Sequence, residues 1–335
     1  GYLSGRFGES AFRGKRVLAG RKAILAAAGI GILSIGLAGQ ALRWTDGLPW
    51  RLSEQALRCA QAREWSPELM ACLAEKDTPD DRLMCHFGPK SRTVSALVWG
   101  DSHATALIPA LEEGAKKHDI SLIQASFAGC IPVDGLDNIP RCEHFNHRVE
   151  KALAEQSFSD VVLVARWSLY LYGQMSGDTE HALKDPSSGR YVRAVAEQRF
   201  AEGLRQRVAG LRAAGHRVWL VKEVPLQEFI VPYRLSRLAM LNRPVEGEGL
   251  AVAHHLKRQA FISQLFSEMA AADNGVAVLD PAPQLCDADG LCRVELNGYA
   301  LYTDDNHISD VGARYIEAFL EPLFSSLQSR GLTAN

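Results

Sequence analysis

The sequence predicts an α/β domain with a parallel sheet covered by helices on both faces, preceded by one transmembrane helix. From residue 93 onward, short, apolar, β-branched runs alternate with longer amphipathic stretches, and residues 23–42 carry no charge. Ligands of such sheets bind at the carboxyl ends of the strands. The expected strands are 93–100, 120–126, 160–166, 216–224 and 275–280, and the expected helices are 104–117, 144–156, 195–215, a part of 249–274, and 308–327.

Length and charge narrow the class of protein. The 335 residues suffice for one sizeable domain with appendages or for two small domains. Hydrophobic residues make up 47% of the chain and charged residues 23%, as in ordinary globular proteins, and the formal net charge is -2. Because this composition creates no overall basic field, we do not expect the chain to bind nucleic acid.

Residues 23–42 (AILAAAGIGILSIGLAGQAL) form the expected membrane span. As a helix they would cross the roughly 30 Å of a bilayer's hydrocarbon core, and they exceed the apolar region of a signal peptide. A buried Gly/Ala-rich helix is the alternative. The basic excess lies on the N-terminal side, which predicts that residues 1–22 are cytoplasmic. These basic residues are Arg6, Arg13, Lys15, Arg16, Arg21 and Lys22.

The remainder of the chain would then lie outside the cytoplasmic membrane. Residues 43–92 are mixed in pattern, and we interpret them as a periplasmic linker and lead-in with a short helix near 53–62. The chain begins at Gly1 rather than Met, so we expect its first residues to be the interior of a longer gene product or a processed terminus, and we treat the chain as a fragment. Residues 1–22 would be the end of an upstream membrane domain.

All seven cysteines follow the span, as an oxidising location would require. Two close pairs lie in loops rich in Gly, Pro and Asp, and a third pair flanks the turn KDTPDD, so three disulfides are expected. Cys59 remains, and we interpret it as a small buried apolar residue. No CxxC occurs, so no zinc or other metal site is expected. The pairs are Cys130 with Cys142, Cys286 with Cys292, and Cys72 with Cys85.

Ser102 lies where chemistry is expected in this topology. Gly100-Asp101-Ser102-His103 follows the first main strand and precedes a helix. The Ser102 hydroxyl would therefore stand above the sheet edge, with its own N–H facing a developing oxyanion. Asp-Ser is also an ordinary N-cap pair, so this tetrapeptide alone is a weak signal of catalysis.

The second signal is Asp304-Asp305-Asn306-His307, just before the final helix. A serine hydroxyl needs a base, and a carboxylate three residues before a histidine can fold back to orient its imidazole. The spacing favours Asp304 over Asp305, and a polar turn with a surface histidine is the alternative. Both signals together, 205 positions apart, predict a Ser102–His307–Asp304 triad.

GDSH after the first strand, with DxxH before the last helix, resembles the SGNH/GDSL hydrolase superfamily. The resemblance implies a flavodoxin-like three-layer α/β/α fold and an oxyanion hole made by the N–H of Ser102, a glycine N–H and an Asn side chain. Gly129, in SFAGCIP after the second strand, is the candidate glycine. The third strand ends Ala165-Arg166-Trp167 without an Asn, so Arg166 or Trp167 is expected to shape that wall instead.

Further stretches resemble one kind of protein, the C-terminal portion of bacterial membrane acyltransferase family three proteins fused to a periplasmic SGNH domain. These are the Glu-x-x-Phe-Arg stretch at 9–13, Gly47-Leu48-Pro49, LVWGDSHA, GCIP, VARW and LCDADGLC. The resemblance covers nearly the whole chain and implies an SGNH catalytic domain at 93–330, an inner-membrane location and a multi-pass acyltransferase domain upstream as the acyl source.

The function implied by this resemblance is O-acylation, and O-acetylation in particular, of a cell-envelope glycan such as lipopolysaccharide O-antigen or exopolysaccharide. The acyl group would pass through Ser102 to a sugar hydroxyl without any cofactor. The same triad with water as acceptor would make a membrane-anchored carbohydrate O-acetyl esterase. A non-catalytic glycan-binding domain is a third possibility, which the presence of all three triad residues argues against.

Overall fold

The computed structural model describes residues 20–45, 47–76, 78–79, 82–90, 92–135, 139–287 and 290–333. The chain divides into two compact units, Gly1–Ser53 and Glu54–Asn335. The stretch at 9–13 and the basic residues Arg6, Arg13, Lys15 and Arg16 lie outside the described residues.

The first unit contains the apolar helix predicted around residues 23–42. Helix α2 covers Arg21–Trp44, and none of its residues is buried. By length and composition it could cross a membrane, and it is the one such helix in the described ranges. A short 3-10 helix, η2 (Pro49–Arg51), follows it.

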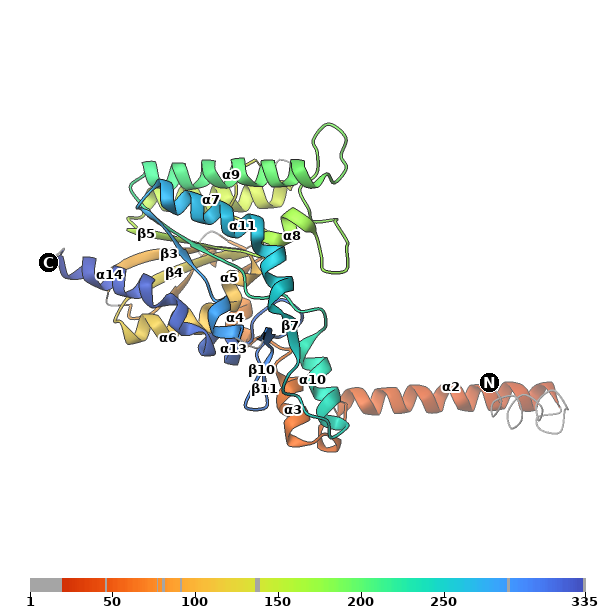
Figure 1. Ribbon diagram of the computed structural model, residues 1–335. Coiled ribbons are helices and arrows are strands. Elements are labelled where there is room, and N and C mark those ends of the chain that lie inside the picture. Colours follow the sequence, from red (N-terminus) through yellow and green to blue (C-terminus); the bar gives the residue numbers. More distant parts are fainter. Residues whose placement is uncertain are drawn as a thin grey trace. The chain divides into compact units, whose positions relative to one another are not determined.

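The second unit is built on a seven-stranded, mostly parallel sheet (Figure 1). The strand order is β1-β4-β3-β5-β6-β8, and β2 runs antiparallel to β4. The five strands predicted from apolar runs are β3, β4, β5, β6 and β8, which pair in parallel. The strands are β1 (Leu73–Ala74), β2 (Cys85–Phe87), β3 (Val94–Gly100), β4 (Ser121–Phe127), β5 (Asp160–Val164), β6 (Arg217–Val221) and β8 (Val276–Leu279).

Helices cover both faces of this sheet, which gives the three layers (Figure 1). One layer holds α7, α9 and α11, and the other holds α6, α13, η4 and α14. Trp99 of β3 is buried among large apolar side chains such as Phe145 of α7, Phe200 of α9 and Phe266 of α11, so the main core lies beneath the first layer. The helices are α6 (Ile108–Lys117), α7 (Pro140–Glu155), α9 (Arg193–Ala213), α11 (Val252–Ala272), α13 (Asp310–Tyr315), η4 (Glu317–Leu320) and α14 (Glu321–Thr333).

The remaining elements are short. The sequence predicts the helix that appears as α3, but the other elements are too short to show a period along the chain. They are α3 (Glu54–Gln61), α4 (Pro67–Ala71), α5 (Ser102–Ala106), α8 (Trp167–Tyr172), α10 (Val231–Met240), β7 (Gly249–Ala251), α12 (Ala282–Leu285), β9 (Leu291–Arg293), β10 (Glu295–Leu296) and β11 (Tyr299–Ala300).

The segment expected to be a linker and lead-in contributes to the sheet. From Glu54 onward it belongs to the second unit, and its strands β1 and β2 both pair with β4. The boundary at residue 93 therefore falls inside this unit. Strands of two and three residues carry too little pattern to be found from sequence.

The single C-terminal helix expected over 308–327 is divided in the structure. Helix α13 ends at Tyr315, η4 follows, and α14 begins at Glu321. Pro322 explains the second break, because proline has no N–H for the helical bond to the carbonyl four residues earlier.

The three cysteine pairs expected from the sequence are disulfides in the structure. The Cα separations are 5.5 Å for Cys72–Cys85, 5.0 Å for Cys130–Cys142 and 3.8 Å for Cys286–Cys292. Cys59 is the free cysteine and is buried, as expected. Burial raises the pKa of its thiol to about 11, so it is protonated at neutral pH and unreactive.

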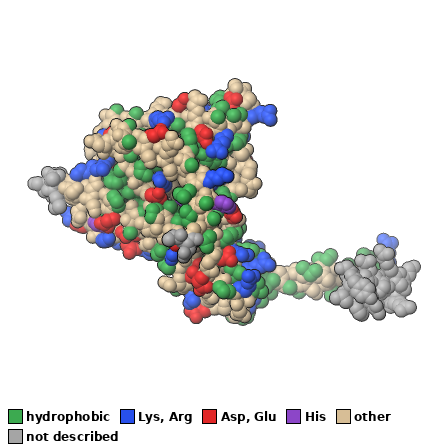
Figure 2. All heavy atoms as spheres, viewed as in Figure 1, with side chains coloured by type: hydrophobic (Ala, Val, Ile, Leu, Met, Phe, Trp, Pro, Cys, Tyr) green, Lys and Arg blue, Asp and Glu red, His purple; other side chains and the backbone are tan. Residues whose placement is uncertain are grey.

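Figure 2 shows acidic and basic side chains interspersed over one face of the molecule.

Candidate active site

Ser102 is the first residue of α5, directly after β3, so it stands at the carboxyl edge of the sheet. The turn before it leaves no room for a side chain, because a Cβ on Gly100 would lie 1.8 Å from the carbonyl oxygen of Val164. Asp101 is buried and holds this turn. Its carboxylate accepts the N–H of His103 at 2.8 Å and the N–H of Arg166 at 2.9 Å.

Asp101 is a structural carboxylate that stays ionised. Burial alone would raise its pKa, but the contact with His103 and the backbone N–H groups of Arg166 and His103 outweigh burial and hold the pKa below its usual range. The charged side chain thereby fixes the loop that follows β3 to the loop that follows β5, and it sets the position of the adjacent serine.

The structure brings Ser102, His307 and Asp304 together in the predicted order. His307 Nε2 lies 2.8 Å from Ser102 Oγ, and His307 Nδ1 lies 2.6 Å from Asp304 Oδ2. The other oxygen of Asp304 accepts the N–H groups of Asn306 and His307, both at 2.7 Å. The carboxylate therefore folds back over its own turn, and this geometry is the one expected from the spacing.

Asp305, the alternative carboxylate, faces elsewhere. Its side chain accepts a hydrogen bond from the amide of Asn306, and its carbonyl accepts the N–H of Gln227 at 2.6 Å. Asp304, the aspartate that the spacing favours, is therefore the one whose carboxylate contacts the imidazole.

The charges in this cluster suit a serine–histidine pair. For Asp304, burial opposes ionisation, but hydrogen bonds from His307 and from two backbone N–H groups lower its pKa to about 2. Burial also lowers the pKa of His307, and the nearby His103 lowers it further, whereas Asp304 acts in the opposite direction. The imidazole is therefore neutral at pH 7 and able to accept a proton.

The lowered pKa of His307 predicts how the serine chemistry depends on pH. Because a base must be neutral, we expect kcat/KM for an aryl acetate to fall on the acid side with a midpoint below the ordinary histidine pKa of about 6.5. His103→Gln removes a group that lowers the pKa of His307, so it should move this midpoint to higher pH. A pH–rate profile for each protein tests this, and an unchanged midpoint in the variant would contradict the role of His103.

Two aromatic rings flank His307. The His103 ring lies 4.7 Å from it between centroids, tilted by 36°, and the Trp65 ring lies 5.1 Å from it in an edge arrangement. Trp65 comes from the turn between α3 and α4, in the segment expected to be a lead-in, and nothing in its local pattern indicates a site. The two rings limit how far the imidazole can move and shield it from water.

Gly129 lies in the loop after β4 with a positive φ of 65°, a conformation that favours glycine. A Cβ there would lie 3.6 Å from Arg141 Nη2 and 3.9 Å from the Tyr170 hydroxyl. Among the described residues, the N–H groups of Ser102 and Gly129 have no recorded protein acceptor. Both N–H groups therefore remain available to a ligand.

Tyr170 is a residue that the sequence analysis missed. It is fully buried, and its hydroxyl has no hydrogen-bond partner in the described part of the chain. Burial raises its pKa well above 10, so the hydroxyl keeps its proton and can donate it. Because α8 is short and mostly apolar or aromatic, its sequence gave no signal that this hydroxyl approaches Gly129.

Arg166 and Trp167 are the two candidates for the side of the oxyanion hole where this chain has no Asn, and they lie in different surroundings. Trp167 is fully buried, its Nε1 donates to the carbonyl of Val221 at 2.7 Å, and its ring packs against Phe200 and Phe266. Trp167 is therefore a core residue, and the expectation that it shapes the wall of the oxyanion hole is corrected. Arg166 is 6% exposed, and its Nε and Nη2 groups have no partner within the described ranges.

The site has no obvious metal-binding group. In the ranges that the structure describes, no three His, Cys, Asp or Glu side chains gather as metal ligands would. The residues that meet at the sheet edge are instead a hydroxyl, an imidazole and a carboxylate linked by hydrogen bonds. These are the parts used for acyl transfer through a serine.

A serine after the first long strand of a three-layer sheet, with an Asp–His pair before the last helices, defines the SGNH type of domain. The family model described as "SGNH domain (fused to AT3 domains)" matches residues 71–322. The chain belongs to this family. The comparison with curated proteins gives no match.

Solved structures resemble the chain in fold. The lipopolysaccharide acetyltransferase periplasmic domain of Salmonella ser. Paratyphi A is 15% identical with a TM-score of 0.50, over 70% of this chain and 84% of that one. A putative acylhydrolase from Bacteroides fragilis is 12% identical (TM-score 0.41; 72% and 91% covered). A GDSL-like lipase from Bacteroides thetaiotaomicron is 15% identical (TM-score 0.41; 80% and 98% covered).

Proposed function

We propose that this chain is the glycan-modifying part of an O-acyltransferase, which passes an acyl group through Ser102 to a hydroxyl of a cell-envelope polysaccharide. The observation that carries the proposal is the hydrogen-bonded series Ser102–His307–Asp304 at the carboxyl edge of the sheet. Membership of a family fused to AT3 domains supports transfer over hydrolysis, with the acyl group supplied by an upstream membrane domain. O-acetylation of lipopolysaccharide O-antigen or exopolysaccharide is the form we expect.

The first step forms the acyl-serine. His307 Nε2 takes the Ser102 proton as Oγ attacks the acyl carbonyl, and Asp304 stabilises the imidazolium that results. The carbonyl oxygen becomes an oxyanion facing the N–H groups of Ser102 and Gly129. When the intermediate collapses, the bond to the donor's leaving group breaks, and that group takes the proton from His307.

The second step releases the acyl group to the acceptor. A sugar hydroxyl gives its proton to His307 while its oxygen attacks the acyl-serine carbonyl. The Ser102–carbonyl bond then breaks, and His307 returns the proton to Ser102. Water in place of the sugar would give hydrolysis, so exclusion of water is essential, and the Trp65 ring beside His307 contributes to it.

Tyr170 takes the place of the missing Asn in this proposal. Its unpartnered hydroxyl lies beside Gly129, where a third donor to the oxyanion is needed. The charges of Asp101, Arg141 and the buried Arg166 are all close enough to interact with this tyrosine, and the two arginines favour negative charge there. The wall therefore offers hydroxyl and guanidinium donors instead of an amide.

The proposed location follows from the first unit and the disulfides. Helix α2 would anchor the chain in the bacterial inner membrane with residues 1–22 in the cytoplasm. The second unit would lie in the periplasm, where three disulfides are stable.

An acyl-transfer experiment tests the proposal. Membranes carrying the full-length protein are supplied briefly with a labelled acyl donor, and the peptide containing Ser102 is expected to carry the label. Adding purified envelope glycan should move the label from Ser102 to the glycan, and Ser102→Ala should abolish both signals. If label leaves Ser102 equally fast with and without glycan and appears only as free acid, the protein is the esterase instead.

A further inference from the structure

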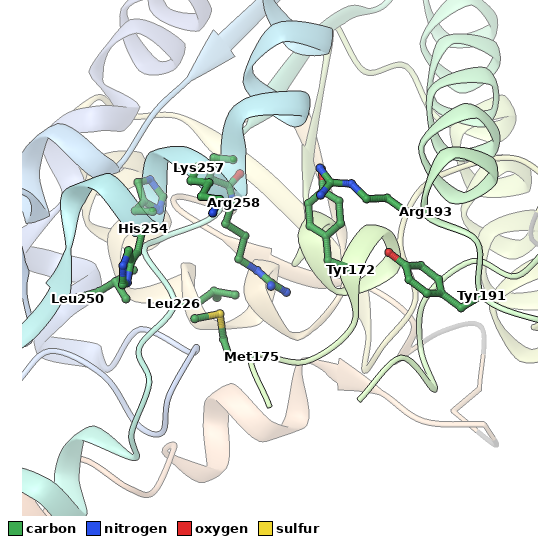
Figure 3. A pocket seen from close by; sticks show the side chains of 11 residues that line it. Tyr172, Met175, Tyr191, Arg193, Leu226, Leu250, His254, Lys257 and Arg258 are labelled. Atoms are coloured by element: carbon green, nitrogen blue, oxygen red, sulfur yellow. The ribbon is translucent and has the colours of Figure 1, made fainter. Parts of the chain in front are cut away.

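A cavity of about 430 Å³ lies beside the loops that follow β5 and β6 (Figure 3). Its volume falls within the usual range for small-ligand sites, about 300 to 1,000 Å³. Tyr172 at the end of α8, Leu226 after β6, and Lys257 and Arg258 near the start of α11 line it, with Arg193 at the start of α9. It is therefore assembled from four separate segments of the domain.

The cavity is positively charged, although the chain as a whole has a net charge of -2. None of the residues that line it is Asp or Glu. Arg193 pairs with Glu197 at 3.0 Å, but neither Lys257 nor Arg258 forms an ion pair with a carboxylate in the described part of the chain. Lys257 and Arg258 thus lack a direct ion pair, although the buried carboxylate of Glu223 interacts with Arg258 without contacting it.

The arginines of the cavity are held in place. Arg258 Nε donates to Ser168 Oγ at 2.9 Å, and its Nη2 donates to the carbonyl of Gly173. The Tyr172 ring lies near both guanidinium groups, 4.6 Å from Arg193 and 5.7 Å from Arg258 (Figure 3). Burial lowers the pKa of Arg258, yet an arginine side chain remains charged in a protein. A fixed guanidinium favours binding of carboxylate or phosphate.

Apolar and aromatic side chains also line the cavity. Leu226, Leu250, Met175 and the Tyr191 ring line it (Figure 3). Sugar rings combine C–H faces, which pack on such side chains, with substituents that bind polar groups. The cavity therefore suits a sugar that also carries a negative charge.

The cavity is joined to the triad by a short segment. Leu226 lines the cavity, and the next residue, Gln227, donates its N–H to the carbonyl of Asp305 at 2.6 Å. A few residues further on, the N–H of Val231 donates to the carbonyl of Asp304 at 3.1 Å. The wall of the cavity and the triad loop are thus parts of one hydrogen-bonded arrangement at the same edge of the sheet.

We propose that this cavity is a subsite for an anionic sugar of the acceptor glycan. A carboxylate or phosphate of the glycan binds Arg258 and Lys257, and the ring packs against Leu226 and Tyr191. A neighbouring sugar then presents its hydroxyl to the acyl group on Ser102. The inference rests on the transferase function proposed above and adds its substrate class, a glycan that contains an acidic sugar.

Binding to the whole chain in detergent tests this subsite. The probes are an oligogalacturonate, a phosphorylated oligosaccharide and a neutral malto-oligosaccharide of equal length, measured by calorimetry. We expect one or both acidic probes to bind more tightly than the neutral one. Lys257→Gln should weaken the acidic complex by about 10-fold, the loss of one charge-assisted contact, whereas Lys257→Arg should retain it.

A matched lysine serves as the control. Lys116→Gln, on α6 in the other helix layer, removes the same charge and should leave binding unchanged. Equal affinity of acidic and neutral probes, equal weakening by Lys116→Gln and Lys257→Gln, or complete competition by inorganic phosphate alone would overturn the subsite. Turnover of an aryl acetate by the unaltered chain reports the serine chemistry separately. If that chemistry is present and acidic binding is absent, only the subsite fails; if an acidic glycan binds but is never acylated, the transferase proposal fails.

Discussion

Replacing Asp304 by Asn is expected to lower kcat for acyl-serine formation by about 10⁴-fold. A loss of this size is typical of a serine triad in which the histidine is held in the wrong tautomer. Asp304 Oδ2 accepts a hydrogen bond from the N–H of His307 Nδ1, and an amide at this position can present N–H groups to the same nitrogen. The imidazole would then carry its proton on Nε2 and could not act as a base toward Ser102.

Asp305→Asn is the matched control, because it makes the same chemical change one residue away. The Asp305 carboxylate contacts Asn306 rather than His307, so this variant should keep kcat near that of the unaltered protein. Stopped-flow release of the aryl group from an aryl acetate measures both. Equal losses in the two variants would mean that the turn as a whole, and not the Asp304–His307 contact, is needed.

Tyr170→Phe is expected to lower kcat by about 100- to 1,000-fold with little change in KM, the usual effect of losing one oxyanion donor. The hydroxyl has no partner to lose in the described part of the protein, so the thermal unfolding midpoint should not fall. A loss of kcat without a loss of stability is the signature of a donor used only in the transition state.

Tyr302→Phe provides the comparison for this substitution. Tyr302 is also fully buried, with its pKa raised by burial, but its hydroxyl lies near Gln227 and not beside Gly129. The kcat of the Tyr302→Phe variant should therefore change little. If both variants lose kcat to the same extent, Tyr170 acts through packing and another group stabilises the oxyanion.

The sequence predicts the fold where its signals are local. Buried parallel strands appear as continuous apolar runs, so β3, β4, β5, β6 and β8 could all be predicted. Ser102 follows a predicted strand, and the Asp304–His307 turn precedes a predicted helix. Both could therefore be placed at the carboxyl edge of the sheet, where ligands bind. The disulfides followed from short spacings in loops.

The parts that the sequence could not predict depend on contacts between distant segments. Trp65 lies far from His307 along the chain, and only the fold brings the two rings together. Tyr170 lies in a short helix of mostly apolar and aromatic residues, where a tyrosine is expected to be a core packing residue. The basic cavity is assembled from α8, α9, α11 and the loop after β6, none of which contains a continuous basic run.

The measurement that tests the account most directly is the acyl content of the envelope glycan in a strain whose full-length protein carries Ser102→Ala. The account predicts that O-acyl groups disappear while the glycan itself is made in normal amount and length, because the acyl group passes through Ser102. Restoring the serine should restore them. Unchanged acylation would show that Ser102 does not carry the acyl group, and increased acylation would identify the protein as an esterase that removes it.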